Sequence, residues 1–183
     1  MRQIAVFPSA LGWMAMVGQG RVLEQLTFGH PSAKAALAAL DPELTHGAAR
    51  GPWNPRLVAR LQAYAAGQPD DFDDVPVDSG TTTAFRHRVL DCCRRIPYGE
   101  TLTYQQLATL AGSPAAARAV GNSMAANRIP LVIPCHRVLA TGGRLGGFSA
   151  PGGTGMKQRL LALEGKRGAS TTCVKHPSGQ RGK

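Results

Sequence analysis

Apolar positions in the first eighty residues change from strand-like to helix-like spacing. Residues 11–28 read as two apolar strands joined by a turn at Gly18-Gln19-Gly20, a pattern typical of a β-hairpin. An alanine-rich stretch from Ala33 to Leu40 then has high helix propensity. Asn54 and Pro55 suit the cap and first position of another helix, in which apolar residues recur at helical spacing. These patterns predict a mixed α/β unit.

A segment without periodicity follows, with the sequence GQPDDFDDVPVDSG over residues 67–80. Its aspartates and prolines favour a solvated acidic linker. A calcium loop is the alternative, but the segment lacks the acidic alternation and terminal glutamate of such a loop. We therefore expect three parts: a domain over 1–78 that ends in this linker, a second domain over 79–165, and a basic, disordered tail over 166–183.

The second part begins with an amphipathic helix over residues 83–95, followed by two helices around a tight turn. Thr103 caps the first of these two, Gly112 breaks it, and Ser113-Pro114 starts another that runs to about Ala126. A pair of this size resembles a helix-turn-helix unit, but ordinary helical hairpins look the same. The last helix is nearly all small residues apart from Arg118. Such a helix either approaches a DNA backbone or shallow groove closely, or packs inside with Arg118 solvated, and the pattern does not decide between them.

Candidate chemistry begins where an apolar run, residues 131–133, leads into Pro134-Cys135-His136-Arg137. We expect the run to be a buried strand. A cysteine in such a place is most often an inert thiol, and the histidine beside it is most often structural. Against this, two basic neighbours favour the reactive thiolate, and the glycine-rich stretch TGGRLGGFSAPGG is suited to a loop over a ligand.

Glu164 supplies a third candidate group. It is the one carboxylate after residue 100, at the end of an apolar-patterned helix over 156–163. A carboxylate bonded to one imidazole nitrogen makes the other nitrogen a better base. Cys135, His136 and Glu164 then form a nucleophile, a base and its orienting partner. Because neighbours on a strand point opposite ways, we expect His136 to reach the sulfur through a water molecule.

The distribution of charge along the chain says more about the binding partner than the composition does. The formal net charge is +10, yet the first hundred residues carry ten basic and ten acidic side chains, and the remainder carries eleven basic and one acidic. This asymmetry favours a polyanionic partner, either nucleic acid or an anionic membrane. With 43% hydrophobic and 17% charged residues the chain is predicted to fold.

The expected location is cytoplasmic and intracellular, or nucleoid-associated in a bacterium. The four cysteines lack the spacing of a secreted disulfide scaffold, which favours reduced thiols. The apolar stretch from Ile4 to Val17 invites a signal-peptide reading, but Pro8 and Gly12 interrupt it. No run is long enough to predict a membrane span.

Four motifs carry a resemblance to a known family. Residues 97–164 closely resemble the DNA-binding and catalytic domain of the O6-alkylguanine-DNA alkyltransferases, through PYGETLTYQQLA, AARAVGNSMAAN, IPCHRV and LLALEG in the family's order and near its spacing. The preceding part resembles the family's N-terminal domain more weakly. The resemblance implies an α+β fold class: a small RNase-H-like α/β domain, then a mostly helical, winged-helix-like domain.

The resemblance also implies roles. Cys135 matches the acceptor that attacks the alkyl carbon on guanine O6 and keeps the group as a thioether, His136 the residue that activates it through water, and Glu164 the partner of that histidine. Asn127 matches an asparagine that holds the turn near the active site. Tyr104 matches a tyrosine that contacts the flipped base and helps guanine depart, and Arg118 matches the arginine that fills the gap left in the duplex. The remaining predicted substrate or DNA contacts are Ala117, Ser123, Arg128, Phe148 and Ser149.

The chain departs from the family pattern at three places. Arg128 stands where proline is usual, which adds a phosphate contact or loosens the turn. Phe148 stands where relatives often have tyrosine, and the loop over residues 149–155 is about two residues longer than the form typical of the family, so the preferred alkyl group stays open. No cysteine precedes Cys92, so the zinc site of some relatives cannot be built in that form, and we expect no metal and no cofactor.

The expected function is DNA repair by direct reversal. One chain transfers the alkyl group of O6-alkylguanine, and of O4-alkylthymine, irreversibly to Cys135 and is then spent. The expected partner is double-stranded DNA, contacted in the minor groove with base flipping, and the expected state is a monomer. The alternative is a non-catalytic protein that binds alkylated DNA, although such proteins replace the motif cysteine. A cysteine hydrolase is a third possibility, for which the sequence identifies no oxyanion donors.

Overall fold

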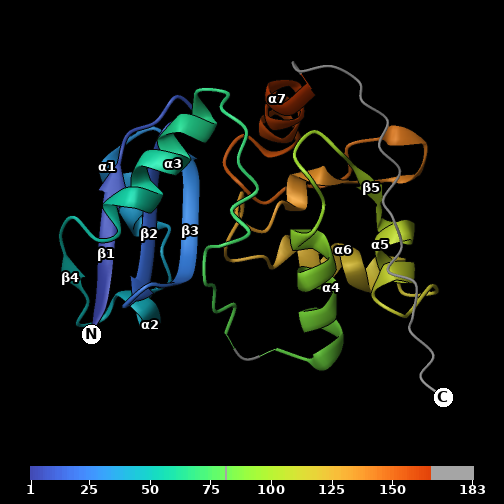
Figure 1. The fold of residues 1–183 in the computed structure, drawn as a ribbon, viewed down its shortest axis with the longest axis horizontal. Helices are drawn as coiled ribbons and strands as arrows, with labels where there is room; N and C mark the ends of the chain where they lie inside the picture. The colour runs from blue at the N-terminus through green and yellow to red at the C-terminus, as the bar shows by residue number, and fades with distance from the viewer. Residues whose placement is uncertain (81, 166–183) are drawn as a thin grey trace.

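A small sheet unit and a helical unit lie side by side in the computed structural model, which describes residues 1–80 and 82–165 (Figure 1). The predicted α+β fold class is therefore confirmed. The predicted tail over 166–183 lies outside the described residues.

The sheet unit is built on an antiparallel meander. Strands β1 (Arg2–Phe7), β2 (Trp13–Gln19) and β3 (Val22–His30) pair in sequence, and the short β4 (Ala49–Arg50) pairs in parallel with β1, giving the order β3-β2-β1-β4. The predicted hairpin is the β2–β3 pair. The apolar stretch considered as a signal peptide forms β1 and β2.

Helices cover both faces of the sheet. On one face α1 (Ala33–Ala38), with α2 (Pro42–Thr45) after it, closes a small cluster around Val17. On the other face α3 (Pro55–Ala65) buries Leu57, Leu61 and Tyr64 against the main core. The predicted cap is present, since the Asn54 side chain accepts a hydrogen bond from the Leu57 amide.

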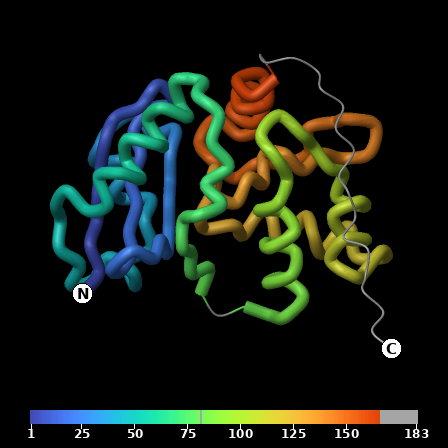
Figure 2. Tube along the Cα trace, viewed as in Figure 1, coloured from blue at the N-terminus to red at the C-terminus, as the bar shows by residue number. Residues whose placement is uncertain are grey.

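The acidic segment is not a solvated linker, which corrects the sequence expectation. The Asp70 carboxylate accepts two hydrogen bonds of 2.7 Å from Arg60 on α3, and Phe72 is 1% exposed. The backbone of Pro76 and Asp78 then bonds to that of Leu23 at the edge of β3. Figure 2 shows this segment running between the two units. Charge pairing and burial hold it there, and the sequence pattern showed neither.

The helical unit contains four α-helices and two short strands among the described residues. The helices are α4 (Ala84–Arg94), α5 (Tyr104–Leu110), α6 (Ala117–Ala125) and α7 (Gly153–Gly165), and the strands are β5 (Leu102–Thr103) and β6 (Val138–Leu139). Two 3-10 turns, η1 (Cys135–Arg137) and η2 (Thr141–Gly143), lie beside β6. The helix-turn-helix pair is present as α5 and α6, although α6 starts later than predicted because residues 113–116 form a turn.

The predicted strand over residues 131–133 is wrong. These residues form a turn in which Leu131 has a left-handed φ of 72° and the Ile133 amide donates to the Ile129 carbonyl. Both Leu131 and Ile133 are nevertheless buried, at 1% and 2% exposed. Apolar character predicted the burial correctly, but a buried turn shows the same pattern as a buried strand.

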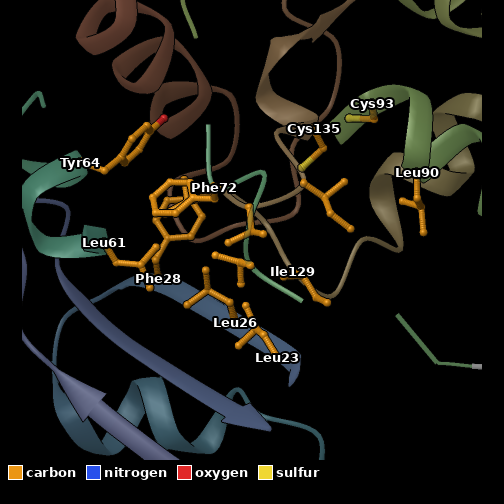
Figure 3. Packing of buried hydrophobic residues seen from close by; sticks show 14 of the residues in the cluster. Leu23, Leu26, Phe28, Leu61, Tyr64, Phe72, Leu90, Cys93, Ile129 and Cys135 are labelled. Atoms are coloured by element: carbon orange, nitrogen blue, oxygen red, sulfur yellow. The ribbon is translucent and has the colours of Figure 1, made fainter. Parts of the chain in front are cut away.

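One cluster of buried apolar residues continues through both units. It includes Phe28 of β3, Leu61 of α3 and Phe72 of the acidic segment, together with Ile129 and Cys135 of the helical unit (Figure 3). The sheet unit therefore supports the segment that carries Cys135.

Candidate active site

A parallel bridge between β5 and β6 brings two predicted site residues together. Leu102 pairs with Val138 and Thr103 with Leu139, while Tyr104 directly follows β5 and η1 directly precedes β6. Thr103 and Gln106 form a capping box at the start of α5, which fixes the helix end that carries Tyr104. Tyr104 and Cys135 consequently line the same cavity.

That cavity has a volume of about 330 Å³. Its walls come from α5, α6, η1 and the glycine-rich loop. They comprise Tyr104, Gly121, Met124, Ala125, Cys135, Gly147, Phe148 and Ser149. The walls are mostly apolar, with a phenol, a thiol and a serine among them, which is the usual character of a small-molecule or base-sized site.

Asn127 holds the turn that leads to Cys135. Its side-chain amide donates to the Ile133 carbonyl at 2.8 Å, and its side-chain oxygen accepts from the Ile129 amide at 3.0 Å. Asn127 also hydrogen-bonds the Cys135 sulfur. One amide group thus fixes both the turn and the thiol.

Cys135 is 4% exposed, and burial raises the pKa of its thiol. The hydrogen bond from Asn127, the positive charge of Lys157 and the backbone amides of Cys135 and His136 oppose this effect without reversing it. The expectation that His136 and Arg137 favour the thiolate is therefore wrong. Burial outweighs the nearby cations, and the Arg137 side chain is bound to carboxylates instead.

His136 is fully buried and lies 2.8 Å from Glu164, measured from Nε2 to Oε1. Within the described residues, its Nδ1 has no hydrogen-bond partner. Burial lowers the pKa of His136 even though Glu164 raises it, and the positive charges of Arg137 and Lys157 lower it further. The imidazole is accordingly neutral at physiological pH, with one nitrogen committed to Glu164 and the other available as a base.

The Glu164 carboxylate is enclosed by donors. Oε2 accepts from Arg137 Nε at 2.9 Å and from the Gly99 amide at 3.1 Å, while Oε1 accepts from Arg137 Nη2 at 2.9 Å and from the Tyr64 hydroxyl at 2.5 Å. Burial alone would raise the pKa of Glu164, but hydrogen bonds and charge from His136 and Arg137 lower it to about 2. Glu164 is thus an anion inside the protein at neutral pH.

Sequence reasoning missed three residues of this centre. The helical spacing of Tyr64 predicted only a core position, and Arg137 was interpreted as a basic neighbour of the thiol. Lys157 was given no role. Lys157 is 1% exposed, donates to the Val138 carbonyl at 2.6 Å, and lies with Nζ 5.8 Å from the Tyr104 ring centre. A charged residue at an apolar position of a helix is the one signal that could have revealed Lys157.

The other predicted contacts divide into surface and buried positions. Arg118 is exposed on α6 with Ala117 half-buried before it, and Ser149 is exposed at the rim of the cavity. Ser123 is 6% exposed and its hydroxyl donates to the Ala119 carbonyl, so its side chain is not on the open face of α6. The prediction that Ser123 contacts DNA or substrate through its side chain does not fit this geometry.

Arg128 is bound to the sheet unit, while its side chain is 45% exposed and its phosphate contact stays a prediction. Its guanidinium donates to the Asp41 carboxylate of the sheet unit at 2.8 Å, and its carbonyl accepts from the Leu26 amide of β3. The turn is therefore tied to the sheet unit and not loosened. A second cavity of about 520 Å³ lies between the units here, and Phe148 and Ser149 line both cavities.

The described residues contain no group of three or more His, Cys, Asp or Glu side chains arranged to hold a metal ion. Within the same residues, no helix has the length and apolar character needed to cross a membrane.

Comparison of the sequence with known proteins assigns the chain to a family. A model described as 6-O-methylguanine DNA methyltransferase, DNA binding domain, matches residues 84–166. The methylated-DNA–protein-cysteine methyltransferase of Mycolicibacterium paratuberculosis is 40% identical over 157 residues, which cover 78% of this chain and 93% of the relative. The chain belongs to the methylated-DNA–protein-cysteine methyltransferase family. The human methyltransferase of the same name is 42% identical over 118 residues, covering 61% of this chain and 56% of the human protein.

Solved methyltransferase structures agree with this assignment. The O6-methylguanine methyltransferase of Mycobacterium tuberculosis superimposes with a TM-score of 0.76 at 34% identity, covering 92% of this chain and 95% of that one. The Mycobacterium tuberculosis OGT in complex with DNA gives a TM-score of 0.74 at 34% identity, covering 89% and 92% of the two chains. The protein is thus a DNA-binding methyltransferase of the DNA-repair class.

Proposed function

We propose that this methyltransferase removes the alkyl group of O6-alkylguanine, and of O4-alkylthymine, by transferring it irreversibly to Cys135. The observation that carries the proposal is the position of Cys135. It lies in the wall of an apolar cavity of about 330 Å³ with Tyr104, while the next residue, His136, is bonded to Glu164. The cavity supplies a place for one base, and the buried pair supplies a place for the thiol proton.

Because burial raises the pKa of Cys135, the thiolate has to be generated within the site. The thiol proton moves to Nδ1 of His136 through one water molecule, and Nε2 stays bonded to Glu164. The sulfur then forms a bond to the alkyl carbon, the carbon–O6 bond breaks, and its electron pair leaves with guanine. Tyr104 donates a hydrogen bond to the departing base, and the proton on His136 is available to neutralise it.

DNA is contacted through the exposed face of α6 in this proposal. Arg118 is the long side chain on a surface of small residues, so the helix fits closely into a minor groove while Arg118 fills the gap of the extruded nucleotide. In this division of labour, residues 79–165 bind DNA and accept the alkyl group, and residues 1–78 support them. The protein acts as a monomer.

The transfer consumes the protein. A thioether on Cys135 is chemically stable, and Cys93, whose pKa Cys135 influences, is fully buried with its pKa raised well above the ordinary value by burial. Each chain therefore accepts one alkyl group.

The test is a single-turnover reaction with duplex DNA containing one O6-methylguanine. Peptide mapping by mass spectrometry is expected to place one methyl group on Cys135 and to account for the methyl lost from the DNA. Cys135→Ser should bind the duplex without transfer. Cys93→Ser, a matched change at a buried neighbouring thiol, should retain transfer. Tight binding with an unmodified Cys135 would support the alternative, a non-catalytic protein that binds alkylated DNA.

A further inference from the structure

A tyrosine from the sheet unit completes the buried network around His136. Tyr64 lies on α3 and is 0% exposed, and Figure 3 shows its side chain pointing from α3 toward α7. Its hydroxyl lies 2.5 Å from Glu164 Oε1 and 3.3 Å from His136 Nε2. Helix α3 therefore contributes directly to the geometry of a histidine 72 positions later in the chain.

Counting donors and acceptors fixes where the protons are. Burial and the charge of Glu164 raise the pKa of Tyr64 well above the ordinary value, so the phenol keeps its proton and donates a hydrogen bond to the carboxylate. Glu164 is ionised and only accepts, so the hydrogen between it and His136 belongs to Nε2. The phenol oxygen lies close to the same Nε2–H as a second, longer acceptor. With Nε2 protonated in a neutral ring, Nδ1 carries the lone pair.

The same hydrogen bond limits how strongly Glu164 attracts a proton onto His136. A carboxylate that accepts several hydrogen bonds is a weaker base and stabilises an imidazolium less. The other ionisable groups facing His136 are Arg137 in η1 and Lys157 in α7, both cationic, and Asp71 of the acidic segment is bonded to Arg137 at 3.0 Å. Tyr64 adds to the effect of the two cations, because it withdraws electron density from Glu164.

We propose that Tyr64 is a positioning residue for alkyl transfer, which holds His136 in the neutral form with its proton on Nε2 by donating to Glu164. This inference rests on the proposed role of His136. It assigns the sheet unit a part in the reaction that needs no contact with DNA or with the alkyl group.

The test combines two measurements on Tyr64→Phe, which keeps the ring packed against Phe72 and Tyr98 and removes the hydroxyl. Nitrogen-15 NMR of labelled His136 reports the tautomer and the pKa of the ring. Single-turnover methyl transfer from duplex O6-methylguanine, followed from pH 5 to 9, reports the reaction. We expect the pKa of His136 to rise and the acid limb of the rate profile to move to higher pH. A displacement by one pKa unit makes transfer at a pH on this limb about tenfold slower.

Leu61→Val is the matched control. Leu61 lies on the same helix and is fully buried. Its side chain is apolar, so it cannot donate a hydrogen bond to Glu164. Its shortening weakens the packing of α3 without changing the donors to Glu164, so the rate profile and the His136 titration should match those of the natural protein. A profile shift of equal size in Leu61→Val would mean that packing, and not the hydroxyl, sets the titration.

A second replacement keeps the proposal testable if Tyr64→Phe does not fold. 3-Fluorotyrosine placed at position 64 alone is a stronger donor of similar shape, and it should lower the pKa of His136. An unchanged tautomer and titration in either variant would overturn the proposal. Failure of the natural protein to methylate Cys135 would instead reject the proposed function, because the NMR titration does not require transfer.

Discussion

The Arg137 guanidinium and the Glu164 carboxylate form a bidentate ion pair inside the protein, and each side chain is 1% exposed. Nε lies 2.9 Å from Oε2, and Nη2 lies 2.9 Å from Oε1. Arg137 also donates to the Ile96 carbonyl and to Asp71, so its charge is shared among an internal anion, a surface anion and the backbone. Removing one partner of such a pair leaves the other charge buried without compensation.

Arg137→Leu is therefore expected to lower the free energy of unfolding by about 3–5 kcal/mol. Urea denaturation followed by circular dichroism measures this loss. Arg118→Leu removes one arginine from the exposed face of α6 and should change the same quantity by less than about 0.5 kcal/mol. Equal effects of the two substitutions would show that net charge, and not the buried pair, is responsible.

Stability is expected to fall with acid in two windows. The folded-state pKa of Glu164 is about 2 against an ordinary value of 4.5, so its contribution is present above pH 4.5 and is lost as the pH falls from 4.5 toward 2. This difference corresponds to about 3 kcal/mol. The pKa of His136 is lowered by burial, so the unfolded chain binds a proton first and stability also falls below about pH 6.5.

Chemical denaturation at a series of pH values would measure both windows. Glu43→Gln changes an exposed carboxylate in the first turn of α2, and its curve should run parallel to that of the natural protein. A free energy of unfolding that stays constant between pH 6.5 and pH 3 would contradict the buried His136–Glu164 pair.

Gly146→Ala should slow alkyl transfer. Gly146 has φ of 66°, and a Cβ at this position would lie 3.0 Å from the Tyr104 hydroxyl oxygen and 3.1 Å from its ring. The tyrosine has to move, and small displacements of a positioned group cost about tenfold or more in rate. Rapid-quench measurement of the single-turnover rate constant checks this.

Gly143→Ala separates backbone strain from the collision with Tyr104. Gly143 has φ of 74°, and nothing lies within 4 Å of a Cβ built on it. Both substitutions carry the left-handed penalty of about 1–2 kcal/mol. Only Gly146→Ala should slow transfer markedly, and equal slowing by both would assign the effect to loop conformation.

Arg118→Ala should slow transfer from duplex DNA much more than transfer from O6-methylguanine supplied as a free base. The free base needs no extrusion from a stack, so it does not need a side chain to fill the gap. Arg21→Ala is the control, because it removes an exposed arginine from the turn between β2 and β3 and changes the net charge equally. Equal slowing of both substrates by Arg118→Ala would argue against base flipping.

The sequence predicted the local features of the fold well and its long-range contacts poorly. Helix caps at Thr103 and Asn54 were recognisable because the capping side chain and its partner lie within three residues. The contact between Tyr64 and Glu164 joins residues 100 positions apart, and no local pattern encodes it.

The same distinction explains the errors near the site. Arg137 follows Cys135 closely in sequence and was assigned to it, but the 3-10 turn η1 directs its side chain toward α7. The acidic segment looked solvated because its partners, Arg60 and Arg137, lie elsewhere in the chain. Motif order located Cys135, His136 and Glu164 without any knowledge of the fold, and their assigned roles remain predictions.

Because one continuous apolar cluster joins Phe28, Phe72 and Cys135, we expect the described residues to unfold as a single cooperative unit. A fragment that begins at α4 would leave the surface under Ile129 exposed and would deprive Glu164 of the Tyr64 hydroxyl. Heat or denaturant should accordingly melt the sheet and the helices together. The sheet unit thus forms part of the interior around Cys135, and we expect an engineered minimal repair protein to need it.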